Sequence, residues 1–194
     1  MRIDRLVRHA THGPLGDSAR HLPQTVLEPK LEALTPHKDR GELALIVSRA
    51  DDGRRQTPKR AHLTPELGVP GDAWQRDCPE KIDAQITVMR VDVAELFANG
   101  QPLSLFGDNL LLDLDLSVEN LPTGSRLRLG EALLEVTPEP HTGCLKFRQR
   151  FGKDALRLTA DRRFRDHRLR GIYVKVIEAG DVAVGESVEV LSRG

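Results

Sequence analysis

The sequence predicts a mainly β fold, a partly closed β-barrel that carries a few short helices. Short apolar runs rich in Leu and Val recur along the chain, and Gly, Pro or Asp residues separate them, as is typical of small barrels. Hydrophobic residues make up 39% of the 194 residues but aromatic residues only 4%, which predicts a core of aliphatic side chains. A chain of this length folds by default as one domain with a sizeable core.

The predicted elements follow one another in a simple order. Residues 1–40 are rich in His, Pro and charge and lack a periodic apolar pattern, so we expect an N-terminal extension or arm there. Residues 41–194 are expected to form the single barrel domain. Its predicted strands cover residues 42–49, 59–63, 85–91, 103–112, 126–129, 132–136, 171–177 and 187–191.

Two segments predict helices, and one pair of residues predicts a tight turn. Residues 93–98 have a short helical pattern that ends at Asn99–Gly100, a typical C-terminal signal. Between residues 145 and 170 apolar residues interrupt many cations, which favours helix over strand for part of the segment. Gly130–Glu131 lies between two predicted strands and suits a hairpin turn.

The overall composition disfavours several classes of function. The 29 basic and 29 acidic residues give a formal net charge of zero, so nucleic acid is not an expected partner. The sequence has neither a run of about 20 apolar residues nor an apolar signal segment at its start, so no membrane contact and a cytoplasmic location are expected. Two cysteines, Cys78 and Cys144, do not form a disulfide framework, and a bridge between them would be regulatory.

Cys144 is the leading candidate for chemistry. It follows Gly143 in a segment that begins where a predicted strand ends, and His141, Lys146 and Arg148 lie near it in sequence. Such neighbours can stabilise a thiolate, which is the form that attacks sulfur or binds a metal. His141 could also act as a base toward this thiol. The alternative interpretations are a buried structural cysteine and a loop histidine that is exposed to water.

Two further features have both a functional and a structural interpretation. Gly107 could allow a close approach to the backbone, and Asn109 could offer its amide to a ligand. Alternatively, these two residues belong to a β-bulge and a turn. The basic residues between 146 and 170 could line a funnel for an anion such as a phosphorylated pterin, or they could form a solvated helical face.

The histidines and the other cysteine do not predict a metal site. Four histidines lie in the N-terminal region at spacings that match neither a helical His-Glu-x-x-His motif nor a zinc finger, namely His9, His12, His21 and His37. Cys78 has acidic neighbours that disfavour a thiolate, and we interpret it as incidental.

Several segments around Cys144 follow one another in a characteristic order. These segments are Leu105–Leu110, Gly124–Gly130, Arg170–Tyr173 and Gly180–Val190. Their order and spacing resemble the MOSC family, the domain named after the C-terminal part of molybdenum cofactor sulfurases, and in particular its small stand-alone bacterial members. The resemblance extends from Gly68 to Leu191. Many members have an arginine and a proline shortly before the cysteine, where this chain has His141–Gly143, and the His-Gly-Gly segment of longer relatives is absent.

The resemblance implies a fold, a cofactor and two possible chemistries. The fold is a barrel of the MOSC type, similar to the barrel domain of pyruvate kinase. The cofactor is the molybdenum cofactor (molybdopterin), and Cys144 either carries a persulfide for sulfur transfer or ligates molybdenum in an enzyme that reduces N-hydroxylated compounds. Pyridoxal phosphate is also associated with the family, and Lys146 is the only lysine near Cys144.

These considerations lead to a predicted site and a competing function. Cys144 and His141 are the predicted catalytic residues, and Cys144 is the predicted metal ligand. The predicted cofactor-binding residues are Gly107, Asn109, Lys146, Arg148 and Arg170. The expected partner is a sulfur donor or acceptor protein, or an external electron donor in the case of a reductase. The competing function is a non-catalytic barrel that docks an anion or a partner through the basic segment 146–170.

Overall fold

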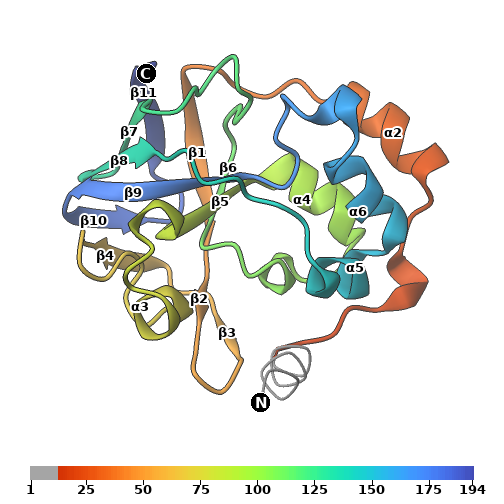
Figure 1. The fold of residues 1–194 in the computed structure, drawn as a ribbon, viewed down its shortest axis with the longest axis horizontal. Coiled ribbons are helices and arrows are strands. Elements are labelled where there is room, and N and C mark those ends of the chain that lie inside the picture. The colour runs from red at the N-terminus through yellow and green to blue at the C-terminus, as the bar shows by residue number, and fades with distance from the viewer. Residues whose placement is uncertain (1–12) are drawn as a thin grey trace.

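A closed barrel of seven strands is the central feature of the computed structural model, which describes residues 13–194 (Figure 1). Around the barrel the strands are β1 (Arg40–Ile46), β11 (Ser187–Ser192), β7 (Arg126–Leu129), β8 (Ala132–Val136), β9 (Ile172–Glu178), β5 (Ile86–Arg90) and β6 (Leu110–Leu112). Neighbouring strands are antiparallel, except that β5 and β6 are parallel. The predicted mainly β barrel is therefore confirmed, and the pairing of β6 with β1 closes it.

Alternating side chains fill the interior of the barrel. Along β9, Ile172, Val174 and Val176 are buried while the residues between them are only partly covered, as a strand with one face on the core requires. The hairpin between β7 and β8 has the predicted two-residue turn, because Leu129 pairs directly with Ala132. Gly130 in this turn has a φ of +51°, in the left-handed region that favours glycine.

Two small sheets lie outside the barrel. Strand β4 (Arg60–Leu63) pairs with β10 (Gly180–Ala183), and β2 (Ser48–Arg49) pairs with β3 (Arg55–Gln56). Short helix α3 (Ala73–Asp77) follows the loop after β4, and the Asp72 side chain caps it by accepting from Trp74 N.

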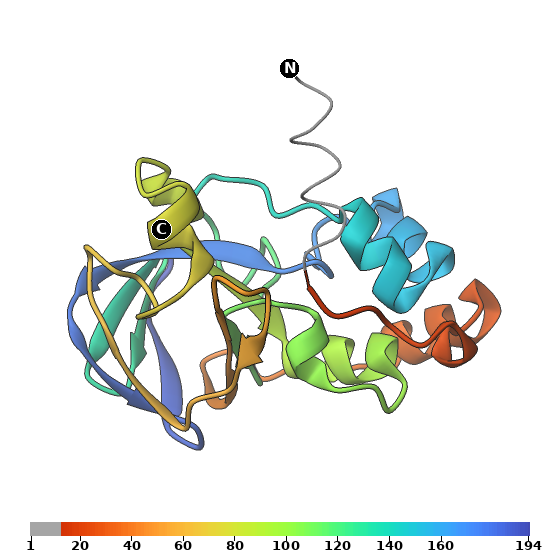
Figure 2. The same cartoon turned by 90° about the horizontal axis from the view of Figure 1, so that it is seen from below.

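A layer of helices packs beside the barrel (Figures 1 and 2). Its members are α2 (Gln24–Glu32), α4 (Val91–Ala98), α5 (Leu145–Phe151) and α6 (Lys153–Thr159). The short 3₁₀ turns are Ser18–Arg20, Ile82–Ala84, Leu103–Leu105 and Arg162–Phe164. Aromatic side chains join this layer into a second core, in which Phe106 stacks on Phe151 with ring centroids 3.8 Å apart. Helix α4 ends at Asn99 in the left-handed conformation, as predicted.

Two sequence-based expectations need correction. Residues 103–112 were expected to form one strand, but only 110–112 do, because a 3₁₀ turn at 103–105 and the positive φ of Gly107 interrupt the extended backbone. Within the expected N-terminal extension, α2 buries Leu27 and Leu31 in the second core and is not loosely packed. His9 and His12 lie outside the described residues.

Residues 13–194 contain no helix long and apolar enough to cross a membrane. Within the same range, no group of three or more His, Cys, Asp or Glu side chains is arranged to hold a metal ion.

Candidate functional site: a cationic pocket with an exposed thiol

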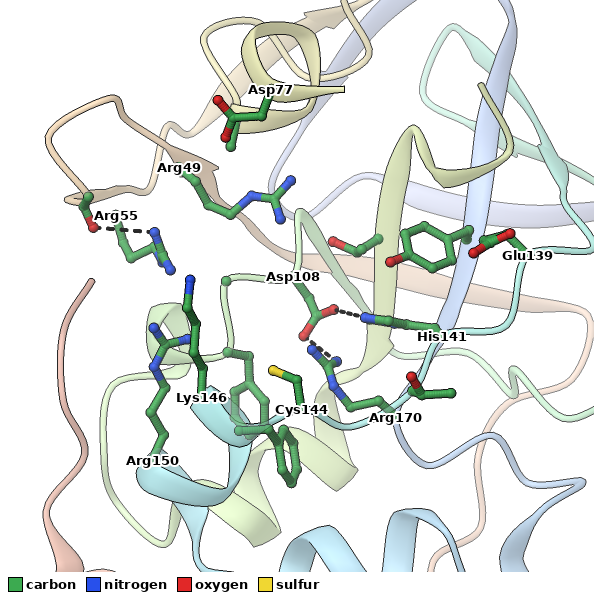
Figure 3. Close-up of a pocket in the computed structure, with 18 of the residues that line it drawn as sticks. Arg49, Arg55, Asp77, Asp108, Glu139, His141, Cys144, Lys146, Arg150 and Arg170 are labelled. Carbon is green, nitrogen blue, oxygen red and sulfur yellow. Dashed lines mark hydrogen bonds and ion pairs between the residues drawn. The ribbon is translucent and has the colours of Figure 1, made fainter. Parts of the chain in front are cut away.

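A pocket of about 720 Å³ lies where the barrel meets the helical layer (Figure 3). Its walls come from the β2–β3 hairpin, helix α3, the loop before β6, the loop between β8 and α5, helix α5 itself and the start of β9. A volume of this size accommodates a small organic ligand or cofactor.

Cys144 lines this pocket at the first turn of α5. It is the N-cap residue of the helix and has an extended backbone, and the structure leaves it exposed. Figure 3 shows its sulfur directed into the pocket. The alternative of a buried structural cysteine is therefore wrong, and the thiol is accessible to a ligand or reagent.

His141, Asp108 and Arg170 form a buried charged cluster, which we call the inner cluster. The Asp108 carboxylate accepts a hydrogen bond from Arg170 Nη1 at 2.7 Å, and its other oxygen lies 3.5 Å from His141 Nε2. Burial lowers the pKa of His141 well below its ordinary value, and Arg170 lowers it further, so the imidazole is neutral at pH 7. Complete burial raises the pKa of Asp108, and Arg170 opposes that rise.

In the inner cluster, His141 contacts Asp108 and Tyr173. Its ring packs against Tyr173 with centroids 4.7 Å apart and ring planes tilted by 50°, and Nε2 faces Asp108. No hydrogen bond joins it to Cys144 among residues 13–194, and its role as a base for the thiol stays a prediction. His141 and Cys144 both line the pocket, His141 from the loop that follows β8 and Cys144 from the start of α5.

Three cations form the opposite side of the pocket, and we call Arg55, Lys146 and Arg150 the cationic end. None of them forms an ion pair with a carboxylate of residues 13–194. Arg150 instead donates to the Leu105 carbonyl at 2.8 Å and to the Pro14 carbonyl at 3.0 Å. The cationic end therefore carries positive charge that the described fold leaves uncompensated.

The pKa values of the cationic end reflect this crowding. Burial, followed by the charge of Arg150, lowers the pKa of Arg55 to about 10. The same two causes lower the pKa of Lys146, while a thiolate at Cys144 opposes the change. Burial also lowers the pKa of Arg150, which the Cys144 thiolate again opposes. A bound anion would relieve this repulsion.

Several buried polar atoms of the pocket residues have no hydrogen-bond partner among residues 13–194. In residues 13–194, four buried side-chain atoms have no hydrogen-bond partner, and all belong to residues that line this pocket: Arg55 Nε, Asp108 Oδ1, His141 Nδ1 and Arg170 Nε. Leaving buried polar atoms unpaired is costly, and native proteins keep few of them. All four lie in the walls of this one cavity, so the cost of unpaired polar groups in residues 13–194 is concentrated there.

The predicted binding residues divide into those that reach the pocket and those that do not. Gly107, Lys146 and Arg170 line it. Gly107 has a φ of +72°, and a Cβ there would lie 3.1 Å from Arg55 Nε, so its role is to make room for that guanidinium. Arg148 is exposed and does not line the pocket, because two residues along α5 is about 200° from Lys146.

Asn109 also lies away from the pocket. It is fully buried, its Oδ1 accepts from Thr87 N at 3.1 Å, and its Nδ2 donates to the Val47 carbonyl at 3.1 Å. Its amide thus ties the strand β5 to the end of β1. Asn109 thus has a structural role, but as a tie between strands and not as the bulge or turn residue considered from the sequence, and its buried amide is not available to a ligand.

The basic segment 146–170 does not form one continuous face. Arg163 pairs with Asp161 and Glu28, and Arg168 donates to the Leu121 carbonyl at 2.6 Å. Arg170 is occupied by the inner cluster. Only part of the segment therefore faces the pocket, which weakens the interpretation as a docking surface for a partner.

Sequence reasoning missed Arg49, Arg55 and Asp108 as pocket residues. Arg49 and Arg55 are directly opposite each other in the β2–β3 hairpin, a like-charge pair that is unfavourable unless a ligand or carboxylates compensate it. Asp72 compensates Arg49 by accepting from its backbone N at 2.8 Å and its Nε at 2.9 Å. The available signal in the sequence was the pair of arginines on either side of Asp51-Asp-Gly53, residues that are typical of a turn.

The fold and the pocket together define a class, a small β-barrel domain with an accessible thiol in a cationic, ligand-sized cavity. A family model described as the MOSC domain matches residues 72–189. The chain belongs to the MOSC domain family, which is associated in general with the molybdenum cofactor. The matched part contains Cys144 and the inner cluster, whereas Arg49 and Arg55 precede it.

Individual relatives support the same fold. The Bacillus subtilis (strain 168) protein YflK is 35% identical over 96 residues, which are 48% of this chain and 41% of YflK, so the chain matches less than half of that relative. The crystal structure of YuaD from Bacillus subtilis has a TM-score of 0.57 at 17% identity and covers 78% of this chain and 95% of YuaD. That of YiiM from Escherichia coli has a TM-score of 0.53 at 23% identity, over 79% of this chain and 71% of YiiM.

Proposed function

We propose that this protein binds the molybdenum cofactor in the pocket and that Cys144 ligates the molybdenum. The observation that carries the proposal is the placement of an accessible thiol in the same cavity as three cations that have no carboxylate partner among residues 13–194. A thiolate is a soft ligand that suits such a metal, and a cationic end suits the phosphate of a pterin cofactor.

The residues present fit this cofactor better than they fit a bare metal ion. Residues 13–194 hold no cluster of three metal-ligating side chains, so Cys144 could supply only one bond. A metal held here would need its other ligands from an organic cofactor, and the pterin of the molybdenum cofactor supplies sulfur ligands. The cavity of about 720 Å³ also has room for that organic part.

Each part of the pocket has a defined role in this proposal. Arg55, Lys146 and Arg150 bind and orient the phosphate through charge-assisted hydrogen bonds. Arg170, which lines the pocket and is paired with Asp108, adds positive charge to the wall of the pocket that contains Cys144. When bound, the cofactor supplies two-electron chemistry such as the reduction of N-hydroxylated compounds, with electrons from a separate donor protein.

Sulfur transfer is the second candidate, and the exposure of Cys144 favours it. A persulfide carrier needs a thiol that a donor or acceptor protein can reach. It does not need a cavity of ligand size lined by three cations that have no carboxylate partner among residues 13–194. Cofactor binding therefore accounts for more of the site than a sulfur carrier does.

Metal content tests the proposal directly. Wild-type protein, Cys144→Ala and the control Cys78→Ala would be purified from a host that makes the cofactor and measured by mass spectrometry for molybdenum. We expect molybdenum in the wild type and in Cys78→Ala and at least tenfold less in Cys144→Ala, because a lost metal–sulfur bond outweighs the phosphate contacts.

Wild-type protein without molybdenum but with sulfane sulfur on Cys144 would establish the sulfur carrier instead. An absorbance band of bound pyridoxal phosphate, lost in Lys146→Gln, would point to a different cofactor.

A further inference from the structure

The N-terminal segment 13–17, which we call the strap, contacts the pocket although it lies outside the residues that match the family model. Arg150 Nε donates to the Pro14 carbonyl in the strap at 3.0 Å. Gln101 adds a second link, because its Nε2 donates to the Arg150 carbonyl at 3.1 Å and its Oε1 accepts from Asp17 N at 2.6 Å. The strap is thus bound to both the side chain and the backbone of Arg150.

Two glycines bring the strap close to the cationic end. A Cβ on Gly16 would lie 2.3 Å from the Arg150 carbonyl oxygen, so only glycine permits this approach. Gly13 has a φ of +116°, and a Cβ there would lie 2.9 Å from Arg150 Nη2 and 3.3 Å from Arg55 Nη2. The backbone of the strap therefore packs against both guanidinium groups.

The strap accepts one of the two hydrogen bonds that hold the Arg150 guanidinium within residues 13–194. Without it, the Arg150 guanidinium keeps one hydrogen bond to residues 13–194, the one to the Leu105 carbonyl at 2.8 Å. Ordering an arginine side chain costs rotamer entropy, which opposes binding. When contacts within the fold order the side chain in advance, the ligand does not have to supply that free energy on binding.

We propose that the strap is a positioning element of the anion site at the cationic end. The Pro14 carbonyl and the backbone of Gly16 hold Arg150 so that it binds, together with Arg55 and Lys146, a phosphate-like oxyanion. This inference rests on the proposed function, in which the bound anion is the phosphate of the cofactor. Binding of an oxyanion can nevertheless be measured without the cofactor.

Isothermal titration calorimetry of the full-length protein with inorganic phosphate tests this role. Gly16→Ala forces the strap away from Arg150, and Leu15→Ala is the matched control because its side chain, on the same strap, is 76% exposed. We expect the control to bind phosphate like the wild type and Gly16→Ala to bind it about tenfold more weakly. Melting temperatures without phosphate are measured in parallel, and a positioning role predicts that they stay close to the wild-type value.

Further outcomes decide between positioning and general destabilisation. Gln101→Met removes the link between Asp17 and Arg150 without adding a clash, so it replaces Gly16→Ala if that variant does not fold. Equal phosphate affinity in the wild type and in a folded strap variant would overturn the inference, as would a wild type that does not bind phosphate. A strap effect on phosphate in a protein that acquires no molybdenum would support the inference and contradict the proposed function.

Discussion

The two sides of the pocket carry similar charged groups but differ in how the fold compensates them. In the inner cluster, Asp108 is bound to Arg170 and faces His141, and burial keeps that histidine neutral. In the cationic end, Arg55 and Lys146 have no carboxylate partner among residues 13–194, and burial followed by the positive charge of Arg150 lowers the pKa of both. The same cavity thus joins a self-compensated region to an uncompensated one.

This difference distinguishes the inner cluster, which stabilises the fold, from the cationic end, which binds a ligand in the proposed function. A buried ion pair is costly to break, because the remaining charge is left without compensation. A cluster of like charges has the opposite property, since the folded state gains when one charge is removed or when an anion binds. Cys144 lies in the same cavity as both regions, where a ligand anchored by the cationic end can reach the thiol.

Asp108→Asn gives the largest expected effect and breaks the compensated side. The variant leaves the buried Arg170 without its carboxylate, so the free energy of unfolding should fall by about 3–5 kcal/mol. Denaturation by urea at pH 7 measures the change. Asp77→Asn is the control, because Asp77 also lines the pocket but is exposed. Equal stability of the two variants would show that Asp108 is not part of a compensated cluster.

The pH dependence of stability gives the next largest effect and concerns His141. Burial and then Arg170 lower its pKa well below the ordinary value of 6.5, so the unfolded chain takes up a proton near pH 6.5 that the folded protein does not. The stability from this group is complete above that pH and is lost as pH falls below it, by up to ~1.4 kcal/mol per pH unit.

The contribution of His141 to the pH dependence of stability is obtained by comparing the melting temperatures of the wild type and His141→Gln. Melting curves of both proteins between about pH 7.5 and pH 5.5 cover the window in which an unfolded histidine titrates. We expect the melting temperature of the wild type to fall more steeply with acidification than that of the variant. Parallel curves would mean that His141 takes up its proton in the folded state, and the inner cluster would then carry a net positive charge.

Local patterns predicted most of the barrel, because alternation, turn residues and apolar runs act within a few positions. The hairpin at Gly130–Glu131 and the end of α4 at Asn99 are examples. The strand expected over residues 103–112 failed for a local reason as well, since an apolar run does not distinguish a 3₁₀ turn from an extended segment. Helix α2 was missed because its two buried residues contact partners that are distant in sequence.

The site was predictable only where its residues lie near Cys144 in the sequence. Lys146 and Arg170 reach the pocket as expected, but nearness alone also selected Arg148, which the period of α5 turns away. Arg55 and Asp108 enter through the β2–β3 hairpin and the loop before β6, whose approach to α5 depends on the closed barrel. Asn109 was selected for its amide, which the backbone of neighbouring strands uses instead.

Lys146→Gln gives the smallest effect, of opposite sign to that of Asp108→Asn. Burial and the nearby Arg150 lower the pKa of Lys146, so the folded protein disfavours this charge. Because the side chain is partly exposed, its removal should raise the free energy of unfolding by about 0.5 kcal/mol or less in the absence of phosphate. The same variant should bind phosphate several-fold more weakly, since it removes one cation of the site.

Urea denaturation of Lys146→Gln with and without phosphate measures both effects. Lys153→Gln is the control, because Lys153 is exposed on α6 and does not line the pocket. A loss of stability in Lys146→Gln would mean that the fold compensates the cationic end as it does the inner cluster, and the distinction between the two sides of the pocket would not hold.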